Sequence, residues 1–138
     1  MIILDTNVIS ELMKESPAPR VKQWLDSQPL SNVFTTSVTE AEILLGIEIL
    51  PHGRKRNALH NVAAGMFAEM FADRILPFGS DASHFFASIW ASRRRAEGPI
   101  GQFDCQIAAI ARVHGAVLAT RNASDFRDCG LQLIDPWA

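Results

Sequence analysis

Three acidic residues from separate parts of the chain have the residue type expected of a site for a divalent cation. Asp5 directly follows an apolar run over residues 2–4, whereas Glu42 and Asp104 lie in stretches with helical spacing. Clustered carboxylates repel one another and are costly to bury, and a divalent cation removes that conflict. Mg²⁺ and Mn²⁺ prefer oxygen ligands and leave room for water and a substrate phosphate. These acids therefore predict a Mg²⁺ or Mn²⁺ site rather than a zinc site.

Asp104 begins an apolar stripe on a predicted helix. The neighbours three, four and seven residues later are Ile107, Ala108 and Ala111, so this face is expected to turn toward a sheet. An acid in the first turn of a helix also interacts favourably with the helix dipole. Taken alone, the residue is therefore compatible with a structural role as well as a functional one.

Glu42 also has apolar neighbours at helical spacing, and no capping role explains it. Glu40, by contrast, follows Ser37 by three residues and matches a capping box at the start of a helix, so we expect it to be structural. The alternative for Glu42 is a surface glutamate at the edge of an apolar stripe. Its apolar neighbours are Val38, Leu45 and Ile49.

Short apolar runs alternate with helical patterns along the whole chain. Strands separated by helices predict an α/β fold with three layers (α/β/α) and a mainly parallel, about five-stranded central sheet. A chain of 138 residues is expected to form one domain, residues 1–138. The expected strands are residues 2–4, 32–36, 75–76, 116–119 and 131–134. The expected helices are residues 6–13, 21–26, 37–50, 57–72, 81–97 and 103–114, with a single turn at 123–127.

Polar residues follow two of the expected strands directly. Asp5 ends the first strand, and Thr120, Arg121 and Asn122 follow the strand at 116–119. Ligands of parallel sheets bind beyond the carboxyl ends of the strands, near the point where the strand order reverses. Both segments are therefore expected at the functional edge of the sheet.

The composition is that of an ordinary globular protein, with 48% hydrophobic residues, 20% charged residues and a net charge of −2. No apolar stretch approaches the roughly 18 residues of a membrane span, and the N-terminus has no basic leader, so a cytoplasmic protein is expected. Two cysteines are too few for a disulfide framework, and the four histidines show no zinc-ligand spacing. The small net charge does not decide nucleic-acid binding, because local patches matter more than the sum.

Four motifs, in this order and spacing, together resemble a PIN domain. They are DTNVISEL at 5–12, TEAEILLGI at 39–47, FDCQIAAIA at 103–111 and LATRNASDF at 118–126. More narrowly, the chain is similar to VapC toxins of the FitB-like branch over its whole length, including the closing residues 135–137. The resemblance implies a PIN-like fold and a metal-dependent ribonuclease that acts as the toxin of a toxin–antitoxin pair.

The resemblance also implies roles for individual residues. Asp5 and Asp104 match the principal ligands of Mg²⁺ (or Mn²⁺), and Glu42 matches an acid that coordinates directly or through water. Thr6 and Thr120 match hydroxyl residues that orient the first acid and a water molecule.

The fourth acid of the catalytic set is open between two positions. Some relatives carry an acid two residues after the threonine, where this chain has Asn122, and others carry it in an aspartate–phenylalanine pair, here Asp125-Phe126. Asn122 can hydrogen-bond water but adds no charge. Asp125 either completes the catalytic set or caps its short turn. Asn7 matches the polar residue that commonly follows in the first motif.

Cleavage is expected to be in-line hydrolysis of an RNA phosphodiester that leaves 5′-phosphate and 3′-hydroxyl ends. Transfer RNA is the first candidate substrate, by resemblance alone. RNA phosphates require basic side chains near the site, and Arg121 lies between two proposed site residues. The further candidates for RNA binding, which solvation alone also explains, are Arg54, Lys55 and Arg56 and the cluster of Arg93, Arg94 and Arg95.

By the same resemblance we expect a small antitoxin whose tail covers the acidic site and whose other end binds operator DNA. This chain would then reach DNA only through the antitoxin, and a homodimer is also expected. Candidate contact residues are Ile9, Met13, Trp24 and Leu25, although packing in a core explains them equally well.

Other classes of protein fit the motifs less well. A haloacid-dehalogenase-type phosphatase needs a second acid where Asn7 stands and a late lysine, whereas the last lysine is Lys55. A dinucleotide-binding domain needs G-x-G-x-x-G after the first strand. The stronger alternative is a catalytically weak PIN scaffold that acts as a binding module in an antitoxin–DNA complex. The three acids argue against this alternative, and Asn122 leaves it open.

Overall fold

The computed structural model describes residues 1–96 and 98–138, which form an α/β fold around one parallel sheet. The strand order is β3-β2-β1-β4-β5, and every neighbouring pair is parallel. This arrangement confirms the predicted five-stranded sheet, which is wholly rather than mainly parallel. The strands are β1 (Ile2–Leu4), β2 (Val33–Thr36), β3 (Ile75–Leu76), β4 (Val117–Ala119) and β5 (Gln132–Ile134).

Alternation along the strands sends successive side chains into two separate cores, one on each face of the sheet. In β1, Ile3 points into one core and Leu4 into the other, and in β4 Leu118 and Ala119 divide in the same way. All four side chains are fully buried. Each core therefore needs its own layer of helices, which explains the three-layer architecture.

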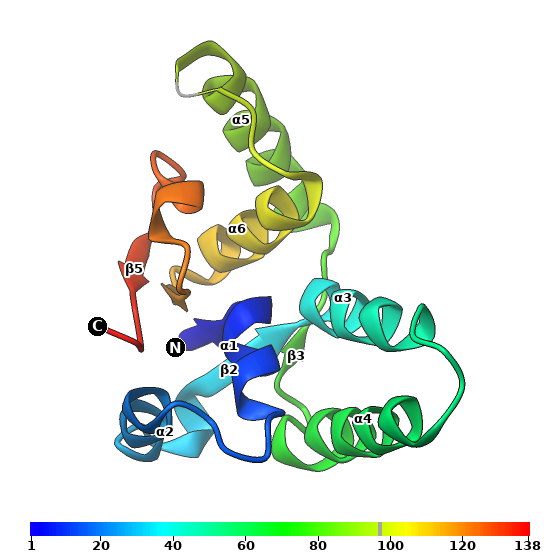
Figure 1. Cartoon of the computed structure of the whole chain (residues 1–138). Coiled ribbons are helices and arrows are strands. Elements are labelled where there is room, and N and C mark those ends of the chain that lie inside the picture. The colour runs from blue at the N-terminus through cyan, green and yellow to red at the C-terminus, as the bar shows by residue number, and fades with distance from the viewer. Residues whose placement is uncertain (97) are drawn as a thin grey trace.

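Two helices cover the first core, three cover the second, and one contacts both (Figure 1). The first layer consists of α5 (Ser80–Ala96) and α6 (Gln102–His114). The second layer consists of α1 (Thr6–Leu12), α2 (Pro19–Asp26) and α4 (Arg54–Gly65). Helix α3 (Ser37–Glu48) lies between the two cores, because Val38 packs into the first and Ile43 and Ile47 pack into the second.

Several predicted helix ends were wrong, each for a local reason. Thr36 rather than Ser37 caps α3, since its side chain accepts a hydrogen bond from the backbone N–H of Thr39 at 3.1 Å. The helix expected at 21–26 begins earlier, at Pro19, because the missing N–H of proline costs nothing in the first turn. The long helix expected at 57–72 begins at Arg54 and ends in a π-helical segment, Met66–Met70. The predicted end of the helix at 81–97 falls on residue 97, outside the described residues.

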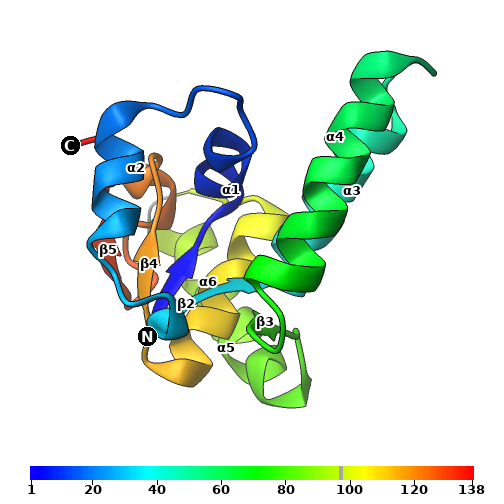
Figure 2. The ribbon, with the colours of Figure 1, turned by 90° about the horizontal axis from the view of Figure 1, so that it is seen from below.

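The strand order reverses between β1 and β4, as seen in Figure 2, where β2 and β3 lie on one side and β5 on the other. The backbone N–H of Asp5 donates to the carbonyl of Ala119 at 2.9 Å, so the chain leaves both strands at the same level. The predicted meeting of the 5–7 and 120–122 segments is therefore confirmed. Across the described part of the chain, the helices are too short or too polar to cross a membrane.

Candidate active site

Asp5 is a buried carboxylate held by donors from two elements. Its side chain caps α1 by accepting from the backbone N–H of Thr6 at 2.8 Å, and its other oxygen accepts from the hydroxyl of Thr120 at 2.7 Å. Only 4% of Asp5 is exposed. Burial raises the pKa of Asp5, although both hydrogen bonds favour its ionised form. Asp5 thus caps α1, and among the described residues its donors are all uncharged groups.

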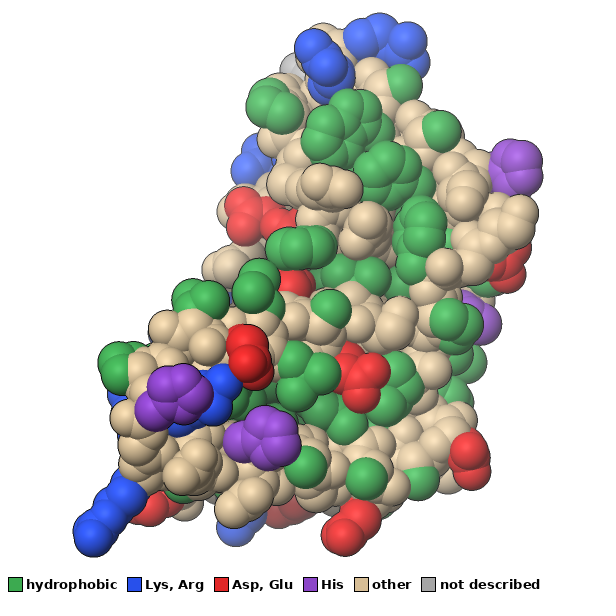
Figure 3. Space-filling model, turned by 90° about the vertical axis from the view of Figure 1, so that its right-hand side faces the viewer, with side chains coloured by type: hydrophobic (Ala, Val, Ile, Leu, Met, Phe, Trp, Pro, Cys, Tyr) green, Lys and Arg blue, Asp and Glu red, His purple; other side chains and the backbone are tan. Residues whose placement is uncertain are grey.

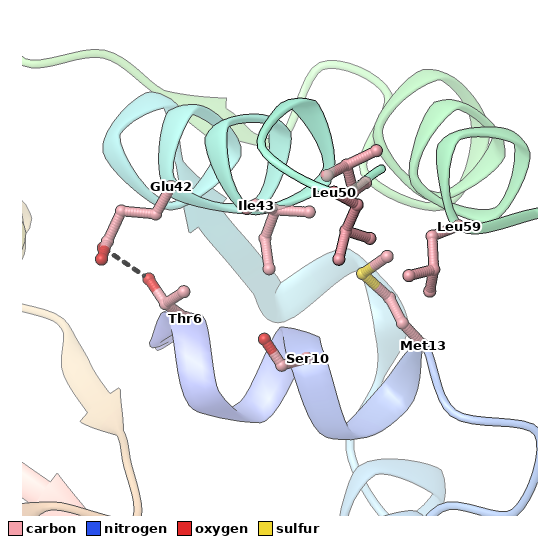
Figure 4. Close-up of a pocket in the computed structure, with 9 residues that line it drawn as sticks. Thr6, Ser10, Met13, Glu42, Ile43, Leu50 and Leu59 are labelled. Carbon is pink, nitrogen blue, oxygen red and sulfur yellow. Dashed lines mark hydrogen bonds between the residues drawn. The ribbon is translucent and has the colours of Figure 1, made fainter. Parts of the chain in front are cut away.

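A chain of hydroxyl groups holds Glu42 against the start of α1. The hydroxyl of Thr6 donates to Oε1 of Glu42 at 2.8 Å (Figure 4). Since a hydroxyl has one proton, the 3.0 Å contact between Thr6 and Thr39 must have Thr39 as its donor. Thr39 is fully buried and was missed in the sequence, where it reads as an ordinary helix residue. Burial raises the pKa of Glu42.

Asp104 lies in the first turn of α6, at the end of a face that is fully buried. Ile107, Ala108 and Ala111 have no exposed surface, so the predicted orientation of this stripe is confirmed. Burial raises the pKa of Asp104 to about 6, and the charges of Asp5 and Asp125 contribute to this increase. Mutual repulsion therefore links acids from three different elements.

One cavity of about 420 Å³ brings Asp5, Glu42 and Asp104 together. An adjoining cavity of about 230 Å³ also includes Asp104, with Asp125 and Arg93 beside it. Asp104 is therefore the side chain shared by both spaces. Other residues lining the larger cavity are Thr6, Asn7, Ser10, Glu11, Lys14, Arg121, Asn122 and Trp137.

The donor set suits a hard divalent cation, but it is open. Within residues 1–96 and 98–138, no three acidic, histidine or cysteine side chains lie close enough together to enclose a metal ion. The oxygen-only set of acids around one cavity has the ligand type that Mg²⁺ or Mn²⁺ prefers, and Mg²⁺ keeps several of its own waters when bound by proteins. If such an ion binds in this cavity, Asp5, Glu42 and Asp104 are the acids that would contact it.

Glu11 lines the same cavity but differs from the other acids in having a counter-charge. It forms a salt bridge with Lys14 at 3.0 Å and accepts from the backbone N–H of Ala18 at 3.0 Å. The hydrogen bond from Lys14 lowers the pKa of Glu11, opposite to the shift of the three cavity acids. Glu11 of α1 therefore stabilises the segment that connects α1 to α2, which is a structural role.

The two candidates for a fourth polar group occupy different places. Asn122 lines the larger cavity, and its backbone N–H donates to the hydroxyl of Thr120 at 3.1 Å. Asp125 lies in η3 (Ala123–Phe126), a short 3₁₀ turn, and is exposed. Its charge nevertheless raises the pKa of both Asp5 and Asp104. Asn7 completes the network, donating to Asp5 at 3.4 Å and to Thr120 at 3.3 Å.

The predicted basic residues separate into three groups. Arg121 lines the acid cavity, with its guanidinium 4.9 Å from the ring centre of Trp137. Arg93 is buried and hydrogen-bonds backbone carbonyls, so it is neither a solvated residue nor exposed to a phosphate. The remaining basic residues lie at helix ends and do not line the described acid cavity. Arg54 and Lys55 are exposed at the start of α4, where Arg56 pairs with Glu48 at 2.8 Å. Arg94 and Arg95 are exposed at the end of α5.

An apolar cavity of about 330 Å³ adjoins the acid site and shares Thr6, Ser10 and Glu42 with it. Helix α1 forms one wall and α3 the opposite wall, with Leu59 of α4 at one end (Figure 4). Its apolar lining comprises Met13, Ile43, Ile47, Leu50 and Leu59. The acid site therefore opens directly onto an apolar groove.

The apolar neighbours of Glu42 do not all face the core. Val38 is buried, but 53% of Leu45 and 75% of Ile49 are exposed, so this stripe turns from core to surface along α3. Hydrophobic side chains reach the surface on the side of the molecule shown in Figure 3. In contrast, the predicted contact residue Ile9 is fully buried, and Met13, Trp24 and Leu25 pack against the second core.

Comparisons with known proteins agree with this architecture. The PIN domain family matches residues 2–130. The VapC ribonuclease Y4jK of Sinorhizobium fredii is 40% identical over 137 residues, covering 99% of this chain and 98% of that protein. Toxin FitB of Neisseria gonorrhoeae is 38% identical over 137 residues, covering 99% of each.

A solved structure gives the same result in three dimensions. The structure of FitAB bound to an IR36 DNA fragment superposes with a TM-score of 0.92 at 38% identity, covering 100% of this chain and 96% of that chain. Together with the acid-lined edge of a parallel sheet, these similarities over the full length show that the chain belongs to the PIN-domain family, among the VapC ribonuclease toxins.

Proposed function

We propose that this VapC-family ribonuclease cuts RNA with a divalent cation held by Asp5, Glu42 and Asp104. The observation that carries the proposal is the shared cavity, which is lined by Asp5 just after β1, Glu42 of α3 and Asp104 of α6, all with raised pKa values. Asp5 is buried and Glu42 and Asp104 are half-buried, and repelling carboxylates in such surroundings lower stability without a cation, so their presence favours a role in chemistry.

The neighbouring side chains hold these acids in place. Thr120 and the backbone of Thr6 fix both oxygens of Asp5, and the hydroxyl of Thr6 fixes Glu42. When bound, Mg²⁺ or Mn²⁺ lowers the pKa of water and neutralises charge that develops on the phosphodiester. Asp104 lines both cavities, so it shares one with Asp5 and the other with Asp125.

RNA would enter across the open side of the acid cavity. Lys14 and Arg121 are the basic side chains lining the described part of that cavity, and both can contact phosphate oxygens. Arg121 is better placed, because Lys14 is already paired with Glu11. A structured RNA such as tRNA is the substrate class that we propose, since recognition of RNA depends on its shape.

An antitoxin segment is the occupant that we propose for the apolar groove. The groove is mostly apolar and has Glu42 in its lining, so an amphipathic segment with a basic side chain could cover the acids. The similarity to FitB, which has been solved as FitAB on DNA, supports such a partner and an indirect contact with operator DNA. Adding a cognate antitoxin should then abolish RNA cleavage.

We also propose a homodimer that buries the exposed stripe of α3. Leu45 and Ile49 are large apolar side chains exposed at 53% and 75%, which favours burial in a protein interface. Light scattering after size exclusion should give a dimer for wild type and a monomer for Leu45→Asp. The control is Leu30→Asp, at an exposed residue outside α3, which should remain dimeric.

Sequencing of RNA ends tests the nuclease directly. Wild type with Mg²⁺ should produce discrete 5′-phosphate ends, and these ends should disappear with EDTA or in Asp104→Asn. Identical fragments from wild type and Asp104→Asn would instead support the alternative, a catalytically weak scaffold that acts through its antitoxin. That alternative is favoured by Asn122, an uncharged residue where some relatives carry an acid, and by the absence of a closed group of metal-binding side chains among the described residues.

A further inference from the structure

Arg93 is a buried arginine that hydrogen-bonds the turn carrying Asp125 and the residues just after it. It lies in the last turn of α5, and only 7% of the residue is exposed. Its Nη1 group donates to the carbonyl of Asp125 at 2.7 Å and to the carbonyl of Arg127 at 3.0 Å. The same nitrogen approaches Sγ of Cys129 at 3.7 Å. One guanidinium therefore clamps the backbone on both sides of residue 126.

Burying the guanidinium of Arg93 costs free energy unless hydrogen bonds and opposite charges compensate it. A buried arginine loses its hydration, and the Nε group of Arg93 is buried without a hydrogen-bond partner. A methionine or leucine of similar volume would fill the same space without that cost. Acids nearby supply the compensating charge, because Arg93 lines the 230 Å³ cavity together with Asp104 and Asp125.

The turn that Arg93 clamps is short and is otherwise held by local backbone hydrogen bonds and by Phe126. Helix η3 has four residues, and Asp125 in it is exposed, with its N–H donating to the carbonyl of Asn122 at 3.0 Å. Short 3₁₀ turns open easily. Phe126 anchors the turn in the core, but an aromatic ring does not set the direction of the preceding carboxylate.

We infer that Arg93 is a positioning residue of the proposed nuclease, which holds the η3 turn from inside the protein so that Asp125 faces Asp104. The inference rests on the proposed function and assigns Asp125 to the acid set. Arg93 touches neither RNA nor the cation in this arrangement and acts through the backbone of Asp125. Its role therefore differs from that of a phosphate-binding arginine.

Arg112 provides a matched control within the same loop. Its Nη1 donates to the carbonyl of Cys129 at 3.0 Å, and its guanidinium lies 4.8 Å from the ring centre of Phe85. Arg112 thus holds the far end of the loop and lines neither acid cavity among the described residues. If loss of either arginine simply loosens the loop, Arg93→Met and Arg112→Met should both lower kcat. If Arg93 specifically positions Asp125, only Arg93→Met should lower it.

The test compares Arg93→Met, Arg93→Lys, Arg112→Met and Asp125→Asn in steady-state RNA cleavage with Mg²⁺. Arg93→Met should lower kcat about 10- to 100-fold with KM unchanged, since small displacements of catalytic groups have effects of this size. Arg93→Lys should recover part of the loss, and Arg112→Met should stay within about threefold of wild type. The double variant of Arg93→Met with Asp125→Asn should be no slower than the slower single variant.

Three results would overturn the inference. They are wild-type kcat in Arg93→Met, a raised KM with a weaker salt dependence, and multiplicative losses in the double variant. The raised KM would identify a phosphate-binding arginine. If Arg93→Met does not fold, the same cycle is run with Arg93→Lys, whose thermal melting reports its fold.

Hydrogen exchange of the metal-free protein separates this inference from the proposed function. Amides of residues 123–127 should exchange faster in Arg93→Met than in Arg112→Met, and equal rates would contradict the clamp. A wild type that cuts no RNA would overturn the proposed function and the catalytic part of the inference, while the exchange result would still decide whether the clamp exists.

Discussion

Replacing Asp104 by Asn should stabilise the metal-free protein, because this carboxylate is held in an unfavourable environment. Burial and the charges of Asp5 and Asp125 raise the pKa of Asp104 from 3.8 to about 6. A folded-state pKa above the unfolded value means that the ionised group opposes folding at neutral pH. Asparagine keeps the shape of the side chain and removes its charge.

The size of the effect follows from the shift in pKa. A difference between 3.8 and about 6 corresponds to about 3 kcal/mol at about 1.4 kcal/mol per unit. Because the Asp104 side chain is only partly buried, solvent screening reduces this to about 1 to 1.5 kcal/mol. Urea denaturation of wild type and Asp104→Asn in EDTA at pH 7.5 measures the difference in the free energy of unfolding.

The pH dependence has a definite sign. Wild type should gain stability relative to Asp104→Asn as the pH falls from about 6 to about 4, because Asp104 then takes up a proton in the folded state. Glu11→Gln is the matched control, and it should destabilise the protein because Lys14 and Ala18 hydrogen-bond the ionised Glu11. An Asp104→Asn variant that is folded but no more stable than wild type at pH 7.5 would refute the reasoning.

Two further predictions concern the groups around the acids. Thr120→Val should lower the free energy of unfolding by about 1–3 kcal/mol and slow RNA cleavage at least about tenfold, because buried Asp5 loses a donor at 2.7 Å. The control is Thr35→Val, which removes a buried hydroxyl bonded to the carbonyl of Leu4 at 3.2 Å and should lower stability but leave cleavage unchanged. Equal losses of cleavage activity in Thr120→Val and Thr35→Val would count against a specific role of the Thr120–Asp5 hydrogen bond. Arg121→Ala should raise KM for RNA and reduce the slope of log KM against log salt by about one, whereas Arg54→Ala should change neither quantity. The reverse pattern would show that RNA phosphates contact α4 instead of Arg121.

The sheet and its functional edge could be predicted from the sequence because both depend on local patterns. Apolar runs mark the strands, and a polar residue at the end of each run marks the edge where β1 and β4 finish. The face of α6 followed from spacing alone, since three buried residues recur behind Asp104 at helical intervals.

The orientation of α3 could not be predicted in the same way. Apolar residues surround this helix on most sides, so spacing does not tell which side meets the core. Ile43 and Ile47 are buried, whereas Leu45 and Ile49 are exposed. The prediction of Ser37 as the capping residue of α3 was wrong because Thr36 and Ser37 both have suitable side chains, and only the backbone geometry distinguishes them.

The different fates of charged residues depend on tertiary contacts. Arg93, Arg94 and Arg95 are alike in the sequence, yet the first is buried against the η3 turn and the others are exposed. Glu11 and Glu42 both line the acid cavity, but only Glu11 meets a lysine. Partners distant in sequence, such as the carbonyl of Asp125, leave no local signal.

Calorimetric titration of Mn²⁺ into wild type and Asp5→Asn tests the central claim most directly. Wild type should give a saturable heat of binding that is absent in Asp5→Asn and retained in Glu11→Gln, since Glu11 has its own counter-charge. No binding to wild type above background, or equal binding to wild type and Asp5→Asn, would contradict a cation site built on these acids.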